Sequence, residues 1–164
     1  MDEQKKPDGV GRVALIGQAP ARVMYGDRPF SGRSGKKISE LAGVRFEDLG
    51  DHFVLFNLLP RWPGRQGDKG DAFPMREARQ KASEMRMVRR YARVVFVGRK
   101  VAEAFRFKGE FCEWGPWENS WAMVMPHPSG VNLWYNDKRN VLRMRRILRR
   151  VLREFSPTAT SSRG

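Results

Sequence analysis

The chain has 164 residues, 40% of them hydrophobic, which suits one folded domain with a real core. Its 32 Lys and Arg residues outnumber 18 Asp and Glu residues, and the net charge of +14 favours a nucleic-acid partner over a merely basic, solvated surface. The single cysteine, Cys112, excludes an internal disulfide and a four-cysteine metal or iron–sulfur site within one chain. With no signal peptide and no apolar run near the about 20 residues of a membrane span, we expect a cytoplasmic monomer that binds no membrane, metal or cofactor.

The first half of the chain predicts two buried strands separated by a helix. The run RVALIG, residues 12–17, is short, apolar and rich in branched side chains. After a loop, Ser34 is expected to cap a helix that Gly43 ends. The run HFVLFNLLP, residues 52–60, predicts the second strand, and a loop rich in Gly, Pro and Arg follows over residues 61–73.

The second half predicts two more strands, each followed by a helix. Apolar residues recur at helical spacing over residues 74–88, where a proline suits the first turn. The runs ARVVFVG, residues 92–98, and SWAMVMP, residues 120–126, predict the third and fourth strands, with a short helix between them. A long basic helix with an apolar stripe is expected from about residue 137 to residue 155.

This alternation of strands and helices predicts the fold class. We expect a three-layer α/β/α sandwich with a central, mostly parallel, four-stranded sheet. A single domain over residues 11–155 would lie between a flexible N-terminus, residues 1–10, and a tail, residues 156–164, whose composition predicts disorder. Ligands of such sheets bind beyond the carboxyl ends of the strands, so the loops that begin there are expected to meet in one crevice.

The first of these loops carries features that suit a flat, phosphate-bearing ligand. The turn over residues 17–20 has a glycine and a proline, so backbone N–H groups near Gln18 and Ala19 can face a ligand. Phe30 can offer a ring face for stacking. The Gly-rich basic run over residues 32–36 is a plausible phosphate cradle at a helix start, although it is not a Walker motif.

Two further side chains at predicted strand ends carry chemistry. Asn57 has one acceptor and two donors, which can read the edge of a pyrimidine; the alternative is that it caps the next turn. His127 is a potential hydrogen-bond donor, general acid or electrostatic stabiliser; the alternative is a structural histidine. Because His127 lies between two prolines and before a Ser-Gly turn, its backbone is restricted on both sides.

These motifs together resemble those of the uracil-DNA glycosylase superfamily, over residues 13–137. GQAP is similar to its first active-site motif, and RPFSGRSG to a segment of its thermophilic class. LFNLLP resembles the strand whose asparagine reads uracil, and HPSG resembles the second active-site loop. The four motifs occur in the family's order, each at the end of a predicted strand.

The resemblance implies that a uracil nucleotide is flipped out of DNA into a pocket. Phe30 would stack on the uracil ring, and Asn57 would hydrogen-bond its Watson–Crick edge. Backbone N–H groups near Gln18 and Ala19 would bind a carbonyl oxygen. His127 would stabilise negative charge on uracil O2 as the N-glycosidic bond breaks.

The resemblance also implies a set of DNA contacts. Ser31, Arg33 and Ser129 would contact phosphates. The loop that begins at Ser129 and Gly130 would enter the duplex, with Leu133 or Trp134 as its wedge.

The chain departs from the family at the residue that orients the attacking water. Ala19 replaces the aspartate of the main class, and the next carboxylate along the chain is Asp27. Three alternatives follow: Asp27 positions the water, Gln18 and backbone groups hold it, or turnover is slow. The thermophilic class's four-cysteine iron–sulfur cluster cannot be present, because the chain has one cysteine.

The resulting hypothesis is a monofunctional glycosylase that removes uracil from single- or double-stranded DNA and leaves an abasic site. One alternative keeps the fold and changes the base to hypoxanthine, thymine or hydroxymethyluracil. Another is a non-catalytic nucleic-acid-binding module. A different nucleotide-binding fold has no support from the sequence, because no GxGxxG motif follows a predicted strand.

Overall fold

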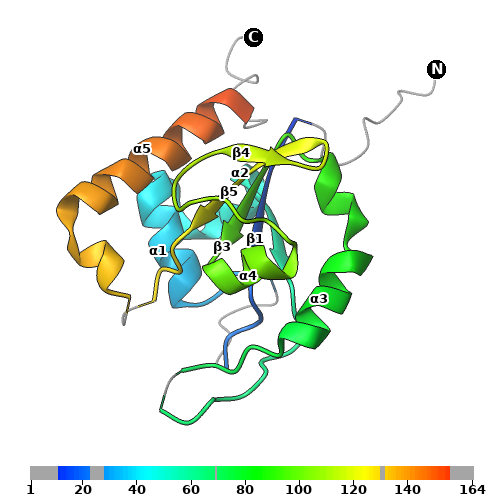
Figure 1. Ribbon diagram of the computed structural model, residues 1–164. Coiled ribbons are helices and arrows are strands. Elements are labelled where there is room, and N and C mark those ends of the chain that lie inside the picture. Colours follow the sequence, from blue (N-terminus) through cyan, green and yellow to red (C-terminus); the bar gives the residue numbers. More distant parts are fainter. Residues whose placement is uncertain (1–10, 23–27, 69, 130–131, 156–164) are drawn as a thin grey trace.

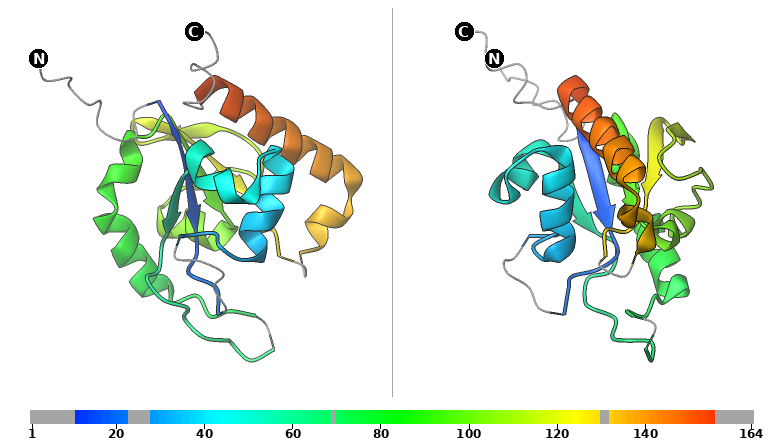
Figure 2. Two further views of the ribbon diagram at one scale, coloured as in Figure 1. Left: turned by 180° about the vertical axis from the view of Figure 1, so that it is seen from behind. Right: turned by 90° about the vertical axis from the view of Figure 1, so that its left-hand side faces the viewer.

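The computed structural model describes residues 11–22, 28–68, 70–129 and 132–155, and within them helices cover both faces of one sheet (Figures 1 and 2). The strands lie in the order β2-β1-β3-β5-β4. Their bounds are Val13–Gly17 for β1, Val54–Asn57 for β2, Arg93–Val97 for β3, Gly115–Trp117 for β4 and Ser120–Met125 for β5. The first four in this order pair in parallel, whereas β4 pairs antiparallel with β5. The three-layer α/β/α prediction is confirmed.

The prediction of four strands missed β4. This strand has only three residues, two of which are Gly115 and Pro116, so it carries no apolar run that a sequence reading can detect. Glu118 has a positive φ of 52° in the tight turn to β5. The edge position explains the proline, because an edge strand needs no hydrogen-bond donor on its outer side.

The helices follow the predicted order with different ends. Their bounds are Arg33–Ala42 for α1, Phe46–Asp48 for η1, Leu49–His52 for α2, Met75–Glu84 for α3, Arg86–Arg90 for η2, Arg99–Ala104 for α4, Leu133–Asn136 for η3 and Lys138–Phe155 for α5. Gly43 ends α1 in the left-handed region, as expected, but Gly32 and not Ser34 is the N-cap. The apolar spacing through residue 88 spans α3 and the 3-10 helix η2 rather than one helix. None of the helices in the described ranges has the length and apolar character to cross a membrane.

The core lies on the two faces of the sheet, because strand side chains alternate between faces. Ile16, Phe96 and Val124 face α3 and α4 in one buried cluster. Leu15 and Met123 face α1 and α5 in the other. Buried strands of this kind, covered on both sides, account for the nearly continuous apolar runs in the sequence.

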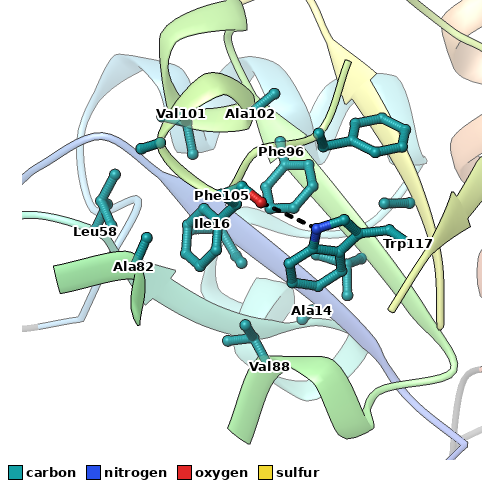
Figure 3. Packing of buried hydrophobic residues seen from close by; sticks show 14 of the residues in the cluster. Ala14, Ile16, Leu58, Ala82, Val88, Phe96, Val101, Ala102, Phe105 and Trp117 are labelled. Carbon is teal, nitrogen blue, oxygen red and sulfur yellow. Dashed lines mark hydrogen bonds between the residues drawn. The ribbon is translucent and has the colours of Figure 1, made fainter. Parts of the chain in front are cut away.

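An aromatic cluster explains why the short strand β4 is held in place (Figure 3). The ring of Trp117 meets Phe96 edge-on at 5.2 Å between centroids, and Phe105 edge-on at 5.9 Å. Its indole Nε1 donates to the carbonyl of Phe105 at 3.1 Å. Trp117 is 6% exposed, so this side chain anchors the sheet edge by packing and by one buried hydrogen bond.

The sheet register brings the carboxyl ends of four strands to one edge. Gly17 at the end of β1 is paired with Asn57 at the end of β2. Val97 at the end of β3 is paired with Met125 at the end of β5. The loop after β2 extends from this same end of the molecule, to which the parallel strands point (Figure 2). The fold therefore gathers the predicted loops as the parallel sheet requires.

Candidate functional site

Phe30 lies against the end of β1, and two glycines make room for it. A Cβ atom on Gly17 would lie 2.6 Å from Phe30 Cζ, closer than carbon atoms approach. A Cβ atom on Gly35, in the first turn of α1, would lie 1.8 Å from the Phe30 carbonyl oxygen. Phe30 itself has a positive φ of 59°, a backbone region that side chains other than glycine rarely adopt. These two glycines, at the end of β1 and the start of α1, thus make room for one half-buried aromatic ring.

Asn57 is the neighbour of this ring across the sheet, because its register partner is Gly17. The backbone beyond Asn57 stays tied to the β1 end: Leu58 N–H donates to the Gly17 carbonyl, and Leu59 N–H to the Gln18 carbonyl, both at 2.8 Å. The half-buried Asn57 side chain makes no hydrogen bond to another described residue, so the turn-capping alternative finds no support in this part of the chain. Asn57 and the Phe30 ring therefore both lie next to Gly17.

The loop after β5 holds His127 in a fixed backbone frame. The His127 carbonyl accepts hydrogen bonds from Asn132 Nδ2 at 2.8 Å and from Ser129 N–H at 2.9 Å. The hydroxyl of Tyr135 donates to the carbonyl of Pro126, one residue earlier. These contacts tie the loop to η3 and add to the restriction that the flanking prolines impose.

His127 lies over the residue that follows β3. A Cβ atom on Gly98 would lie 3.8 Å from His127 Cβ, and Gly98 has a φ of 101° that favours glycine. Burial lowers the pKa of His127, and the negative charge of Asp71 partly opposes this effect. Burial therefore favours the neutral imidazole, which carries one ring N–H donor.

The loop after β1 has its own fixed contacts. Gln18 Nε2 donates to the carbonyl of Ala72 at 3.2 Å, which ties this loop to the segment after β2. Ala19 is half-buried, and its backbone N–H donates to no other described residue. Asp27, which the sequence suggested as a water-positioning group, lies outside the described residues.

The residues expected to contact DNA differ in how far they are exposed to solvent. Arg33 is exposed, but Ser31 is only 6% exposed, so its hydroxyl is not presented as a phosphate contact requires. Ser129 is half-buried, and Gly130 lies outside the described residues.

The two residues expected as wedges differ sharply in exposure. Leu133 is 77% exposed. Trp134 is half-buried and packs edge-on against Tyr135 at 4.8 Å between ring centroids, next to the core. Leu133 is therefore free to enter a partner, whereas Trp134 holds the loop against the protein.

Asp71 is near this constellation, and the sequence analysis did not single it out. It belongs to the loop between β2 and α3, and its negative charge raises the pKa of His127 against the effect of burial. The only sequence signal was a carboxylate in a Gly-rich loop after a predicted strand, a pattern too common to be specific. Within the described ranges, no three His, Cys, Asp or Glu side chains are grouped as a metal site would require.

The comparisons with known proteins agree with the geometry. A family model, the uracil DNA glycosylase superfamily, matches residues 7–151 of the chain. No curated protein matches the sequence. The matched segment contains all five strands and the loops that carry Phe30, Asn57 and His127. The chain therefore belongs to the uracil DNA glycosylase superfamily, and it is a DNA glycosylase, a hydrolase that acts on DNA in base excision repair.

Proposed function

We propose that this protein removes uracil from DNA by hydrolysing the N-glycosidic bond, and that it leaves an abasic site. One observation carries the proposal. Gly17 touches the ring of Phe30 and is also the register partner of Asn57. An aromatic face beside an amide edge is the arrangement that a flat pyrimidine needs, since the face stacks on the base and the edge reads its polar atoms.

In this proposal, His127 stabilises the leaving base. The uracil ring takes the bonding electrons as the C1′–N1 bond breaks, and the charge gathers on its carbonyl oxygens. A neutral imidazole that donates a hydrogen bond to O2 favours this state, provided that it is in place before the reaction. The two hydrogen bonds to the His127 carbonyl support such preorganisation, and the Ala19 N–H would bind a second carbonyl oxygen.

DNA contacts in the proposal come from the surface around these strand ends. Arg33 at the start of α1 would contact a phosphate, where the helix N-terminus adds to the attraction. Leu133 would be the wedge that fills the space of the flipped nucleotide, because it is the exposed member of its pair. Ser129 would contact a phosphate next to that wedge, whereas the buried Ser31 is left out.

The test is base release from an oligonucleotide with one uracil, incubated with excess protein and then treated with alkali. We expect cleavage at uracil only, in single- and double-stranded forms. The variant His127→Ala should release base at least about 100-fold more slowly, as expected for loss of one preorganised donor, while DNA binding changes little. The matched control is His52→Ala, because His52 precedes β2 at the opposite end of the sheet.

The same assay distinguishes the other substrates. Oligonucleotides with hypoxanthine, thymine or hydroxymethyluracil in place of uracil should remain intact. Cleavage of one of these, with uracil untouched, would support glycosylase activity but overturn the proposal that uracil is the substrate base. Absence of cleavage on every substrate would overturn the proposed uracil activity.

A further inference from the structure

The loop between β2 and α3 is ordered by its own hydrogen bonds, and the proposed function gives it no role. Its two sides pair through a bridge between Arg65 and Asp71. Ala72 N–H donates to the Gly64 carbonyl, and Gln66 N–H to the Gly70 carbonyl, both at 2.8 Å. A long loop with its own hydrogen bonds keeps its side chains in defined positions, which is a condition for a functional role.

This loop is fastened to the first active-site loop at two points. Gln18 Nε2 donates to the Ala72 carbonyl, so the residue after Asp71 is held at the end of β1. The guanidinium of Arg22 lies 5.7 Å from the centroid of the Trp62 ring, a cation–π contact between the two loops. Asp71 is therefore fixed relative to the strand ends rather than carried on a free hairpin.

Within the described part of the chain, the carboxylate of Asp71 is held through one of its oxygens. Trp62 Nε1 donates to Asp71 Oδ1 at 3.0 Å. Among the described residues, no other hydrogen bond or ion pair to this carboxylate is formed, and none of them engages Oδ2. Gln18 holds the residue next to Asp71 at the end of β1, and the negative charge of Asp71 raises the pKa of His127 against the effect of burial.

A carboxylate beside the sugar assists hydrolysis, and Ala19 does not supply one. The base leaves with the electron pair of the C1′–N1 bond, and positive charge develops on the sugar. A water oxygen then forms a bond to C1′, and the water proton passes to a base and on to solvent. A negative group beside the sugar favours both steps, because it stabilises the cation and accepts the proton.

Resting on the proposed function, we propose that Asp71 is the catalytic carboxylate, which orients and deprotonates the attacking water in place of the residue missing at position 19. Trp62 and Gln18 act as positioning residues. Trp62 donates a hydrogen bond to the Asp71 carboxylate, and Gln18 donates one to the backbone carbonyl of the next residue, Ala72. The loop after β2 thereby completes a site whose other parts come from the loops after β1 and β5.

The test compares Asp71→Asn with Asp68→Asn in single-turnover release of uracil from a single-stranded oligonucleotide. Asparagine keeps an oxygen for the Trp62 N–H and removes only the charge, so the loop stays in place. We expect Asp71→Asn to slow base release about 10²- to 10⁴-fold, the range of a general base, and Asp71→Glu to restore part of it. Asp68→Asn, a charge loss in the same exposed loop, should leave the rate within about 3-fold of wild type.

Two further readouts separate the possible outcomes. Binding to an oligonucleotide with an uncleavable 2′-fluorodeoxyuridine should be similar for wild type and Asp71→Asn. In NMR titrations, Asp71→Asn should lower the pKa of His127 relative to wild type, whereas Asp68→Asn should not.

The outcomes distinguish this proposal from the proposed function. If wild type releases uracil and Asp71→Asn behaves like Asp68→Asn, the role of Asp71 is overturned and the uracil activity stands. An unchanged His127 titration in Asp71→Asn would also overturn it, because the two groups would not face each other. A wild type that releases no base would overturn both proposals.

Discussion

Substituting Gly17 by alanine tests the contact that seats Phe30. The new Cβ atom would lie 2.6 Å from Phe30 Cζ and 3.0 Å from Cε1, against about 3.5–4.0 Å for carbon atoms in contact. Gly17 has no positive φ, so alanine fits its backbone. The ring must therefore move by about 1 Å, although its own carbonyl is already confined by Gly35.

The magnitude follows from two effects. Overpacking of this kind destabilises a fold by about 1–3 kcal/mol, and each kcal/mol lowers the melting temperature of a domain of this size by about 2–4 °C. If the ring is pushed off the base, the loss of stacking of about 1–3 kcal/mol lowers kcat/KM for uracil release by about 5- to 150-fold. The variant Gly17→Ala should thus lose both stability and activity.

A double-mutant cycle with Phe30→Ala isolates the contact. Urea unfolding and base release are measured for Gly17→Ala, Phe30→Ala and the double variant. Once the ring is absent, the alanine at position 17 meets no obstacle, so its effect should fall below about 0.5 kcal/mol. The control is Gly50→Ala, whose Cβ would meet only Leu55 Cδ1 at an ordinary 3.8 Å. Equal effects of Gly17→Ala with and without Phe30 would refute the reasoning.

Three other predictions concern the sheet edge, the wedge and pH. Trp117→Phe should destabilise the protein by about 1–3 kcal/mol in urea unfolding, because the Phe105 carbonyl loses its indole donor and stays buried; no change would mean that β4 does not depend on this anchor. Leu133→Ala should leave stability within about 0.5 kcal/mol, since the side chain is 77% exposed, yet it should slow base release from double-stranded more than from single-stranded DNA. Burial lowers the pKa of His127 in the folded protein, so the unfolded chain binds the proton more readily. Wild type should therefore lose more stability than His127→Asn as pH falls through the ordinary histidine range near about 6.5. Parallel stability profiles of the two proteins between pH 7.5 and pH 5 would contradict that assignment.

Local pattern was sufficient for most of the fold. The apolar runs around Leu15, Val95 and Met123 identify buried strands because side chains on both faces of a covered parallel sheet must be apolar. The apolar stripe of α5, which includes Met144 and Leu148, can be recognised in the sequence because a helix packed on one side repeats its apolar residues every three or four positions. The strand ends, and with them the loops that carry the family motifs, follow from these elements.

The sequence by itself therefore determined the three-layer class, the family and the candidate residues Phe30, Asn57 and His127, whose roles remain predictions. Tertiary structure alone decided which residues meet. The short strand β4 exists because Trp117 is anchored by residues distant along the chain. Leu133 is exposed and Ser31 buried, the reverse of what a leucine and a serine in loops would suggest. The electrostatic effect of Asp71 on His127 links two loops 56 positions apart, and such links depend on the order of strands in the sheet, which no local spacing encodes.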